Sequence, residues 1–296
     1  MSFQKLIGNE QIKSLLTKTV QAGKVSHSYM FCGIEGIGKF LFAKEFANMI
    51  LCNSTSGSKP CSNCKACIEL ESNNHPDYYE INVQENTIKI EQIRLMQAKI
   101  LEKPIISDKK VYIINNADTM TKEAANCLLK TLEEPPEYVC IILIVSNENA
   151  LLNTIKSRCT KINFRQIEIS DLKNFIQKNY DIQEISDGLI QASGGSIKKL
   201  EQMIESKETY EKLDKIFNNI ERTNMLDAFQ ELSILYDDKD KINEILEYIN
   251  TILCKKARED IRYVNHINAV EEAKKNLKAN ANYDMTIDKL LFNIYK

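Results

Sequence analysis

Four cysteines that lie close together carry the strongest chemical signal in this sequence. Cys52 is followed after eight residues by Cys61, and Cys64 and Cys67 then follow at intervals of three. Four thiolates suit the tetrahedral coordination of Zn²⁺, and the short intervals allow one tight turn to bring three sulfurs to a single ion. The group predicts a structural zinc site in a loop at about 52–75, with four ligands and no open position for catalysis.

The spacing alone leaves other interpretations of this loop open. An iron–sulfur cluster also takes four cysteine ligands, whereas a disulfide framework would require an oxidising compartment. A zinc ribbon that reads DNA is a further alternative, although Lys59, Lys65 and the scarcity of aromatic side chains give it little support. His75 lies close by, and we expect it to be a packing residue because four cysteines already complete the shell.

The remaining cysteines are scattered singly along the chain. In a reducing compartment such residues are mostly small apolar packing residues. We expect this role for all five of them: Cys32, Cys127, Cys140, Cys159 and Cys254.

A glycine-rich segment predicts a phosphate-binding loop between a strand and a helix. It contains Gly33, Gly36 and Gly38 and ends at Lys39. Glycines allow backbone N–H groups to point at phosphates, and the N-terminus of the following helix favours negative charge. Lys39 would then reach the β- and γ-phosphates. The alternative is a glycine-rich turn that holds no ligand.

The residues that ATP hydrolysis needs around such a loop are missing. Phe40 stands where a Ser or Thr hydroxyl would ligate Mg²⁺, and Glu35 adds a negative charge inside the loop. Asn115 and Asn116 stand where two carboxylates would hold the metal and orient water, and amides have neither the charge nor the basicity for this. We expect Asp118 to cap the next helix. ATP binding in this site is therefore doubtful.

The pattern of apolar residues predicts the elements that position these groups. Short buried strands alternating with helices indicate an α/β domain with a parallel sheet covered on both faces. The predicted strands are 28–32, 111–114 and 139–145, and the predicted helices are 41–51 and 126–133.

After Phe164 the pattern becomes helical. The segment 167–200 predicts several short helices, interrupted at 193–196. From Glu201 onward, apolar residues recur at intervals of three and four, and no Pro or Gly follows Gly195, which favours long helices. The second half of the chain is therefore predicted to be all-α.

Length and charge set further limits. A chain of 296 residues is expected to form two or three domains. The formal net charge of −2 lacks the basic excess of a protein that grips DNA over a long footprint. No apolar run of about 18 residues predicts a membrane span, and the first residues lack the apolar region of a secretory signal. We expect a cytoplasmic protein without a membrane partner.

Several motifs, taken together and in this order, resemble the bacterial clamp-loader subunits of the AAA+ family. The resemblance extends motif by motif over about 3–205, while the last third agrees only in being helical. The motifs are His27 to Phe31 before the glycine loop, Ala117-Asp118 with Met120-Thr121, Asn126 to Pro136 with its Leu-Glu-Glu-Pro-Pro ending, and Ser157-Arg158-Cys159.

Within that family, the gamma/tau motor subunits keep the hydroxyl and the acidic pair, whereas delta-prime subunits tolerate their loss. This sequence resembles the delta-prime subunits at Phe40, Asn115 and Asn116. The resemblance implies a stator of the DNA polymerase III clamp loader, which places the sliding clamp on primed DNA. It implies gamma/tau and delta subunits as partners in a hetero-oligomeric ring, zinc at the matching cysteines, and little or no ATPase or polymerase activity of its own.

The resemblance also implies roles for individual residues. Arg158 matches an arginine that reaches the γ-phosphate of ATP bound by a neighbouring subunit, where a guanidinium neutralises developing charge. Its alternative role is a structural salt bridge. Ser146 and Asn147 stand at the sensor 1 position and are expected to be structural here. Lys198 stands at sensor 2, where the family usually has Arg, and helix capping by Ser196 is the alternative for this segment.

The domain organisation implied by the resemblance has three parts. Residues 1–165 would form a RecA-like AAA+ domain with the zinc loop, 166–207 a helical lid, and 208–296 a helical collar that joins subunits. Three rival functions remain: an active gamma/tau-type ATPase, a zinc-dependent nucleic-acid-binding module acting alone, and a nucleotide kinase that shares only the phosphate loop. The kinase would need Ser or Thr at position 40.

Overall fold

The computed structural model describes residues 3, 6–54, 59–180, 185–221, 232–237, 239 and 241–295. Residues 55–58 of the predicted zinc loop therefore lie outside the described part. The chain divides into two compact units, Met1–Asp171 and Leu172–Lys296, and each is described by itself.

The first unit is built on a parallel sheet of five strands in the order β2-β3-β4-β1-β5. Every strand pair is parallel, so all the strands end at the same edge of the sheet, here called the carboxyl edge; the opposite edge is the amino edge. The strands are β1 (Ser28–Cys32), β2 (Tyr78–Ile81), β3 (Lys110–Ile114), β4 (Val139–Val145) and β5 (Thr160–Asn163).

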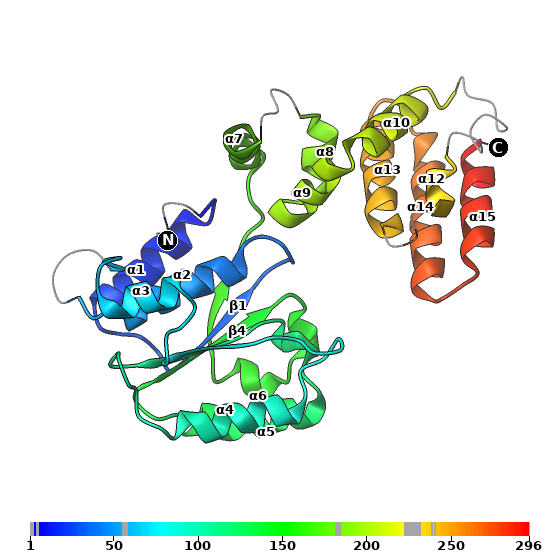
Figure 1. Cartoon of the computed structure of the whole chain (residues 1–296). Coiled ribbons are helices and arrows are strands. Elements are labelled where there is room, and N and C mark those ends of the chain that lie inside the picture. The colour runs from blue at the N-terminus through cyan, green and yellow to red at the C-terminus, as the bar shows by residue number, and fades with distance from the viewer. Residues whose placement is uncertain are drawn as a thin grey trace. The chain divides into compact units, whose positions relative to one another are not determined.

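Helices cover both faces of this sheet (Figure 1). Because strand side chains alternate between faces, the sheet contributes to two separate buried clusters. One cluster contains Phe31 and Ile142, and it packs against α1 (Glu10–Gln21), α2 (Lys39–Leu51) and α3 (Lys65–Glu71). The other contains Met30 and Ile141, and it packs against α4 (Ile90–Ile100), α5 (Lys122–Glu133) and α6 (Asn153–Lys156).

The sequence predicted the three central strands but not the two outer ones. β1 and β4 have the predicted bounds, and β3 begins one residue earlier than predicted. β2 and β5 lie at the edges of the sheet, and most of their side chains are not buried. A short edge strand with charged residues such as Glu80 and Lys161 shows no apolar run, so its pattern could not be distinguished from that of a loop.

Both predicted helices exist and begin earlier than predicted. α2 begins at Lys39, directly after the glycine segment. α5 begins at Lys122, and the Thr121 hydroxyl accepts a hydrogen bond from the Ala124 N–H as its N-cap. Two 3₁₀ turns, η2 (Ala117–Thr119) and η3 (Glu148–Ala150), follow β3 and β4.

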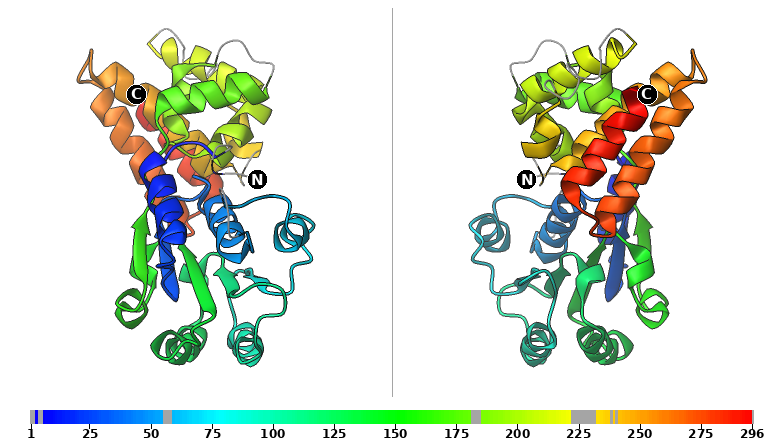
Figure 2. Two further views of the ribbon diagram at one scale, coloured as in Figure 1. Left: turned by 90° about the vertical axis from the view of Figure 1, so that its left-hand side faces the viewer. Right: turned by 90° about the vertical axis from the view of Figure 1, so that its right-hand side faces the viewer.

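The second unit is helical throughout its described residues, as predicted. Short helices come first, and the break at 193–196 separates α8 from α9. The long helices α13, α14 and α15 follow and pack side by side (Figure 1), and α14 and α15, orange and red, are also clear in Figure 2. The α13 stripe of Ile242, Ile245 and Ile249 is buried. The bounds are α7 (Ile169–Asn179, which begins in the first unit), α8 (Asp187–Ala192), α9 (Ile197–Glu205), α10 (Lys207–Asn218), α12 (Ile234–Asp237), α13 (Ile242–Ala257), α14 (Tyr263–Lys278) and α15 (Tyr283–Tyr295).

Among the described residues, no helix combines the length and the apolar character that crossing a bilayer requires.

A buried carboxyl in α2 predicts a pH-dependent stability. Glu45 is only 4% exposed, and its Oε1 has no hydrogen-bond partner among the described residues. Burial raises the pKa of Glu45 to about 7. Between the ordinary pKa and this value the unfolded chain releases a proton that the folded chain keeps, so stability falls as the pH rises through this window.

We therefore expect Glu45→Gln to raise the free energy of unfolding at pH 8 by roughly 2 kcal/mol, and to flatten its pH dependence between about pH 4.5 and 7. Urea unfolding at several pH values measures this. An unchanged slope in the variant would contradict the assignment.

Candidate functional site

The glycine segment joins the carboxyl end of β1 to the first turn of α2. Phosphate loops lie in this position, between a strand and the helix that follows it. Gly36 and Gly38 adopt φ values of 80° and 88°, a left-handed conformation that favours glycine. At Gly33, an added Cβ would lie 2.7 Å from Ile37 Cδ1 and 3.0 Å from the Phe164 carbonyl oxygen. The local backbone therefore depends on these glycines.

Lys39, the predicted phosphate ligand, is turned onto the loop itself. Its side chain is buried, and Nζ donates to the carbonyl oxygens of Gly33 (2.6 Å) and Ile34 (2.7 Å) and to Ser146 Oγ (3.1 Å). Burial lowers the pKa of Lys39, while Asp118 and Glu35 act in the opposite direction. In this conformation the ammonium group is satisfied by protein oxygens.

The positions that would hold magnesium offer no carboxylate or hydroxyl. Phe40 is half-buried and packs against the core cluster of β1 and α2. Asn115, directly after β3, donates from Nδ2 to Asn82 Oδ1 at 3.3 Å. Asn116 adopts a left-handed backbone conformation ahead of η2. These side chains do not fit a magnesium-bound triphosphate, because no anionic oxygen is available from them for the metal.

The prediction that Asp118 caps a helix is wrong. Asp118 lies inside η2, and its carboxylate accepts hydrogen bonds from the N–H groups of Ser146 (3.4 Å) and Asn147 (2.8 Å). It ties the segment after β3 to the segment after β4. Asn147 Oδ1 in turn accepts from the Asn149 N–H, capping η3. Ser146 and Asn147 thus make structural contacts here.

Arg158 lies at the opposite edge of the sheet from the glycine segment. It precedes β5, whose first residue Thr160 pairs with Tyr29 near the start of β1, while the glycine segment follows the end of β1. Ser28 Oγ donates to the Arg158 carbonyl oxygen at 2.6 Å. With a rise of about 3.3 Å per residue, the two ends of the five-residue strand β1 lie about 13 Å apart. Arg158 and Lys39 are therefore not brought together in one subunit.

The Arg158 guanidinium is held by two acceptors. Nη1 donates to the Thr154 carbonyl oxygen at 2.9 Å, and Nη2 donates to Glu133 Oε1 at 2.8 Å. The arginine side chain remains 34% exposed. Sequence reasoning did not identify Glu133 as its partner. The salt bridge considered as the alternative role is present. Among the described residues, the guanidinium makes these two contacts and no other hydrogen bond.

The four cysteines converge as predicted. All four Sγ atoms lie within 4.8 Å of one another, and the separations are 4.0 Å for Cys52–Cys64 and for Cys61–Cys67. Tetrahedral zinc with Zn–S bonds of about 2.3 Å requires S···S separations of about 3.8 Å, whereas a disulfide requires about 2.05 Å. The sulfurs are thus free thiols whose spacing fits a metal ion.

The surroundings of the cysteines favour the thiolate form at Cys61 and the neutral thiol at Cys52 and Cys67. The backbone N–H groups of Cys61 and Cys64 point at Cys52 Sγ (3.4 Å) and Cys61 Sγ (3.3 Å). Hydrogen bonds from the backbone of Asn63 and Cys64 lower the pKa of Cys61 to about 6. Burial raises the pKa values of Cys52 and Cys67, and a bound cation would reverse this by stabilising their thiolates.

His75 is a packing residue, as expected. It is buried, its Nδ1 accepts from the Asp77 N–H at 3.0 Å, and its Nε2 lies 3.2 Å from Ser107 Oγ. Asp77, which sequence reasoning did not single out, is fully buried and accepts hydrogen bonds from the N–H groups of Ile105, Ile106 and Ser107 at 2.8–2.9 Å. These contacts secure the chain that leads from the cysteine loop into β2.

The sensor 2 candidate belongs to the second unit. Lys198 lies in the first turn of α9, and Ser196 caps that helix by accepting from the Lys199 N–H at 3.2 Å. The capping alternative for Ser196 is thus confirmed, and the phosphate-contacting role of Lys198 stays a prediction.

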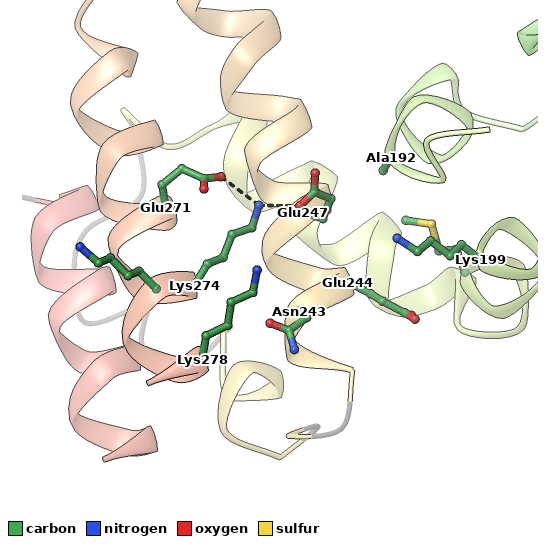
Figure 3. Close-up of a pocket in the computed structure, with 10 residues that line it drawn as sticks. Ala192, Lys199, Asn243, Glu244, Glu247, Glu271, Lys274 and Lys278 are labelled. Atoms are coloured by element: carbon green, nitrogen blue, oxygen red, sulfur yellow. Dashed lines mark hydrogen bonds and ion pairs between the residues drawn. The ribbon is translucent and has the colours of Figure 1, made fainter. Parts of the chain in front are cut away.

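A cavity of about 630 Å³ lies within the second unit. Its charges are mixed, because Lys274 bonds to both Glu247 and Glu271 (Figure 3). The lining contains both lysines and glutamates. The lining residues are Ala192, Lys199, Met203, Asn243, Glu244, Glu247, Glu271, Lys274, Lys275 and Lys278.

Residues 8–168 match the model of the protein family described as DNA polymerase III, delta subunit. The chain is 37% identical over 158 residues to DNA polymerase III subunit delta' of Bacillus subtilis, covering 53% of this chain and 48% of that protein. It is 33% identical over 183 residues to subunit tau of the same organism, covering 62% of this chain and 32% of that protein. The chain thus spans about half, or less, of the length of these relatives.

A solved structure resembles nearly the whole chain. It is a DNA polymerase III gamma subunit-related protein from Thermotoga maritima, with a TM-score of 0.51, 19% identity, and coverage of 95% of this chain and 98% of that one. At this identity the likeness concerns the fold alone. It agrees with the predicted and observed architecture, an α/β domain on a parallel sheet followed by an all-helical region.

Proposed function

Because this chain belongs to the DNA polymerase III delta subunit family, we propose that it is a clamp-loader subunit of the delta-prime type. In this role it assembles with gamma/tau and delta subunits, and the complex places the sliding clamp on primed DNA. The name of the Bacillus subtilis relative supports this assignment. A subunit of the gamma/tau type is the second candidate, since tau relatives match as well.

The observation that favours the delta-prime type is the chemistry at the carboxyl edge of the sheet. Phe40, Asn115 and Asn116 supply no anionic oxygen for magnesium and no base for water. Lys39 is engaged by the carbonyl oxygens of its own loop. We infer that the subunit does not turn over ATP and acts as a stator.

The proposal predicts weak, magnesium-independent nucleotide binding. Without a metal ligand at Phe40 or Asn115, we expect ATP to bind the isolated chain with the same affinity, within about twofold, in magnesium and in EDTA. Titration calorimetry measures both affinities. The double variant Phe40→Thr, Asn115→Asp is the matched control, in which magnesium should strengthen binding. A strong effect of magnesium on the unchanged chain would favour the gamma/tau alternative.

In the assembled ring, Arg158 would act in trans. Its place at the amino edge of the sheet keeps it away from the loop of its own subunit, and 34% of its side chain is exposed. A guanidinium is suited to this role because it neutralises charge that develops on a phosphoryl group. We assign it to the γ-phosphate of ATP bound by the adjacent subunit.

We assign the cysteine group to zinc with a structural role. Four ligands close the coordination shell, so the ion would brace the junction of α2 and α3 without taking part in a reaction. We further propose the division into a lid at 166–207 and a collar at 208–296, with the collar joining the subunits.

Co-purification tests the assignment as a whole. The chain, expressed with the gamma/tau and delta subunits of its own organism, should elute with them as one complex on gel filtration. The complex should load the clamp onto primed DNA, and omission of the chain should abolish loading. Loading at an unchanged rate without this chain would exclude the proposed function.

A further inference from the structure

We propose that Glu133 is the positioning residue for Arg158. It would hold the guanidinium in the pose from which the arginine meets a neighbour's phosphate. This inference rests on the proposed function of Arg158, because it assigns to Glu133 the orientation of the guanidinium that this function requires. It begins with the contact between Glu133 Oε1 and Arg158 Nη2 at 2.8 Å.

The contacts of Arg158 come from different elements, so together they fix its geometry. Thr154 in α6 accepts from Nη1, and Glu133 at the end of α5 accepts from Nη2. The arginine backbone is also fixed, because its N–H donates to the Ile155 carbonyl oxygen (3.1 Å) and its carbonyl oxygen accepts from Ser28 Oγ. Arginine has five N–H donors. Two contacts therefore orient the group, and within the described part of the chain its other N–H donors have no hydrogen-bond partner, so a phosphate could accept from them.

Helix stability does not explain a glutamate at this position. Glu133 is the last residue of α5, Glu134 is the C-cap, and Pro135 follows. The C-terminus of a helix carries a partial negative charge, so carboxylates are unfavourable there. The side chain of Glu133 is also 49% exposed, so it contributes little to the core. The ion pair with Arg158 gives this carboxylate a function that the helix alone does not.

The two glutamates at the end of α5 provide a matched pair for the experiment. They are adjacent, both are exposed, and both carry the same charge. Among the described residues, only Glu133 forms an ion pair with Arg158. Glu134→Ala therefore removes a charge from the same place without removing the contact.

Single-turnover ATP hydrolysis by the assembled loader tests the proposal. We expect Glu133→Ala to lower the rate constant about tenfold, because a misplaced catalytic group loses rate steeply. Nucleotide affinity should be unchanged. Glu133→Gln should keep most of the rate, since its amide oxygen can accept the same bond, and Glu134→Ala should match the wild type. The double variant Glu133→Ala, Arg158→Ala should be no slower than Arg158→Ala alone.

Other outcomes would overturn the proposal. A wild-type rate for Glu133→Ala, in a loader that Arg158→Ala slows, would show that Glu133 does not position the arginine, while the proposed function would stand. A faster rate would show that the carboxylate restrains the arginine. Additive effects in the double variant would assign Glu133 a separate structural role. No effect of Arg158→Ala would remove both the proposed function of the arginine and this inference.

Discussion

Arg158→Ala is expected to slow ATP hydrolysis at the neighbouring site of the assembled loader by about 10³-fold in a single-turnover experiment, the lower end of the effect of a trans-acting arginine. The reason is electrostatic, since charge developing on the γ-phosphoryl group would lose the cation that Arg158 supplies in addition to the neighbour's own lysine and magnesium. ATP binding to the neighbour should change little, because the arginine acts mainly on the transition state.

Assembly provides the control for this prediction. Arg158 is partly exposed, so its replacement should leave the gel-filtration profile of the complex unchanged. Arg158→Lys should recover only a small part of the rate, because an ammonium cannot reproduce the planar fork of a guanidinium. An assembled Arg158→Ala complex that hydrolyses ATP at the wild-type rate would exclude the trans role, and the contact with Glu133 would then be a structural salt bridge only.

Cys61→Ser is expected both to remove zinc and to destabilise the first unit. The four sulfurs are spaced for one ion, and a serine hydroxyl is a much poorer zinc ligand than a thiolate. Loss of a structural metal is among the largest single-site effects, so we expect the free energy of unfolding to fall by roughly 4 kcal/mol. Metal analysis and urea unfolding of the purified chain measure the two quantities.

The chain contains a suitable control cysteine. Cys254 in α13 is exposed and lies outside the group, so Cys254→Ser should keep both zinc content and stability. Treatment of the wild type with a strong chelator should reproduce the effect of Cys61→Ser. Two results together would contradict the zinc assignment. The purified wild-type chain would contain no metal, and it would unfold at the same urea concentration as Cys61→Ser.

Local sequence patterns predicted those strands and helices whose own apolar pattern matches the environment that they have in the folded protein. β4 is a run of apolar residues that is buried on both faces, so its pattern and its environment are the same. β5 is buried only at Ile162, and it is a strand because β1 provides a parallel partner. Pairing of this kind is a property of the assembled sheet, and no pattern within four residues contains it.

The candidate sites also divide into contacts that neighbouring residues determine and contacts that depend on the packing of distant segments. The spacing of Cys61, Cys64 and Cys67 constrains three sulfurs locally, and their convergence with Cys52 was predicted. The Arg158 contact with Glu133 joins residues that lie 25 positions apart, on elements brought together by packing. Asp118 has the composition of a helix cap, but tertiary contacts direct its carboxylate to two N–H groups after β4.

The proposed stator differs from a motor subunit in the side chains at the two edges of its sheet. At the carboxyl edge, Lys39 bonds to its own loop and Asn115 to Asn82. At the amino edge, Arg158 is held by Glu133 and its side chain is partly exposed. The first arrangement offers magnesium no carboxylate or hydroxyl at positions 40, 115 and 116, and in the proposed assembly the second would supply a cation to another subunit.

ATP turnover by the purified, isolated chain in the presence of magnesium tests this account most directly. We predict that phosphate release is indistinguishable from that of the Lys39→Ala variant, because neither protein has the oxygens that hold the metal and activate water. Magnesium-dependent release that Lys39→Ala abolishes would contradict the account and identify the chain as a working ATPase.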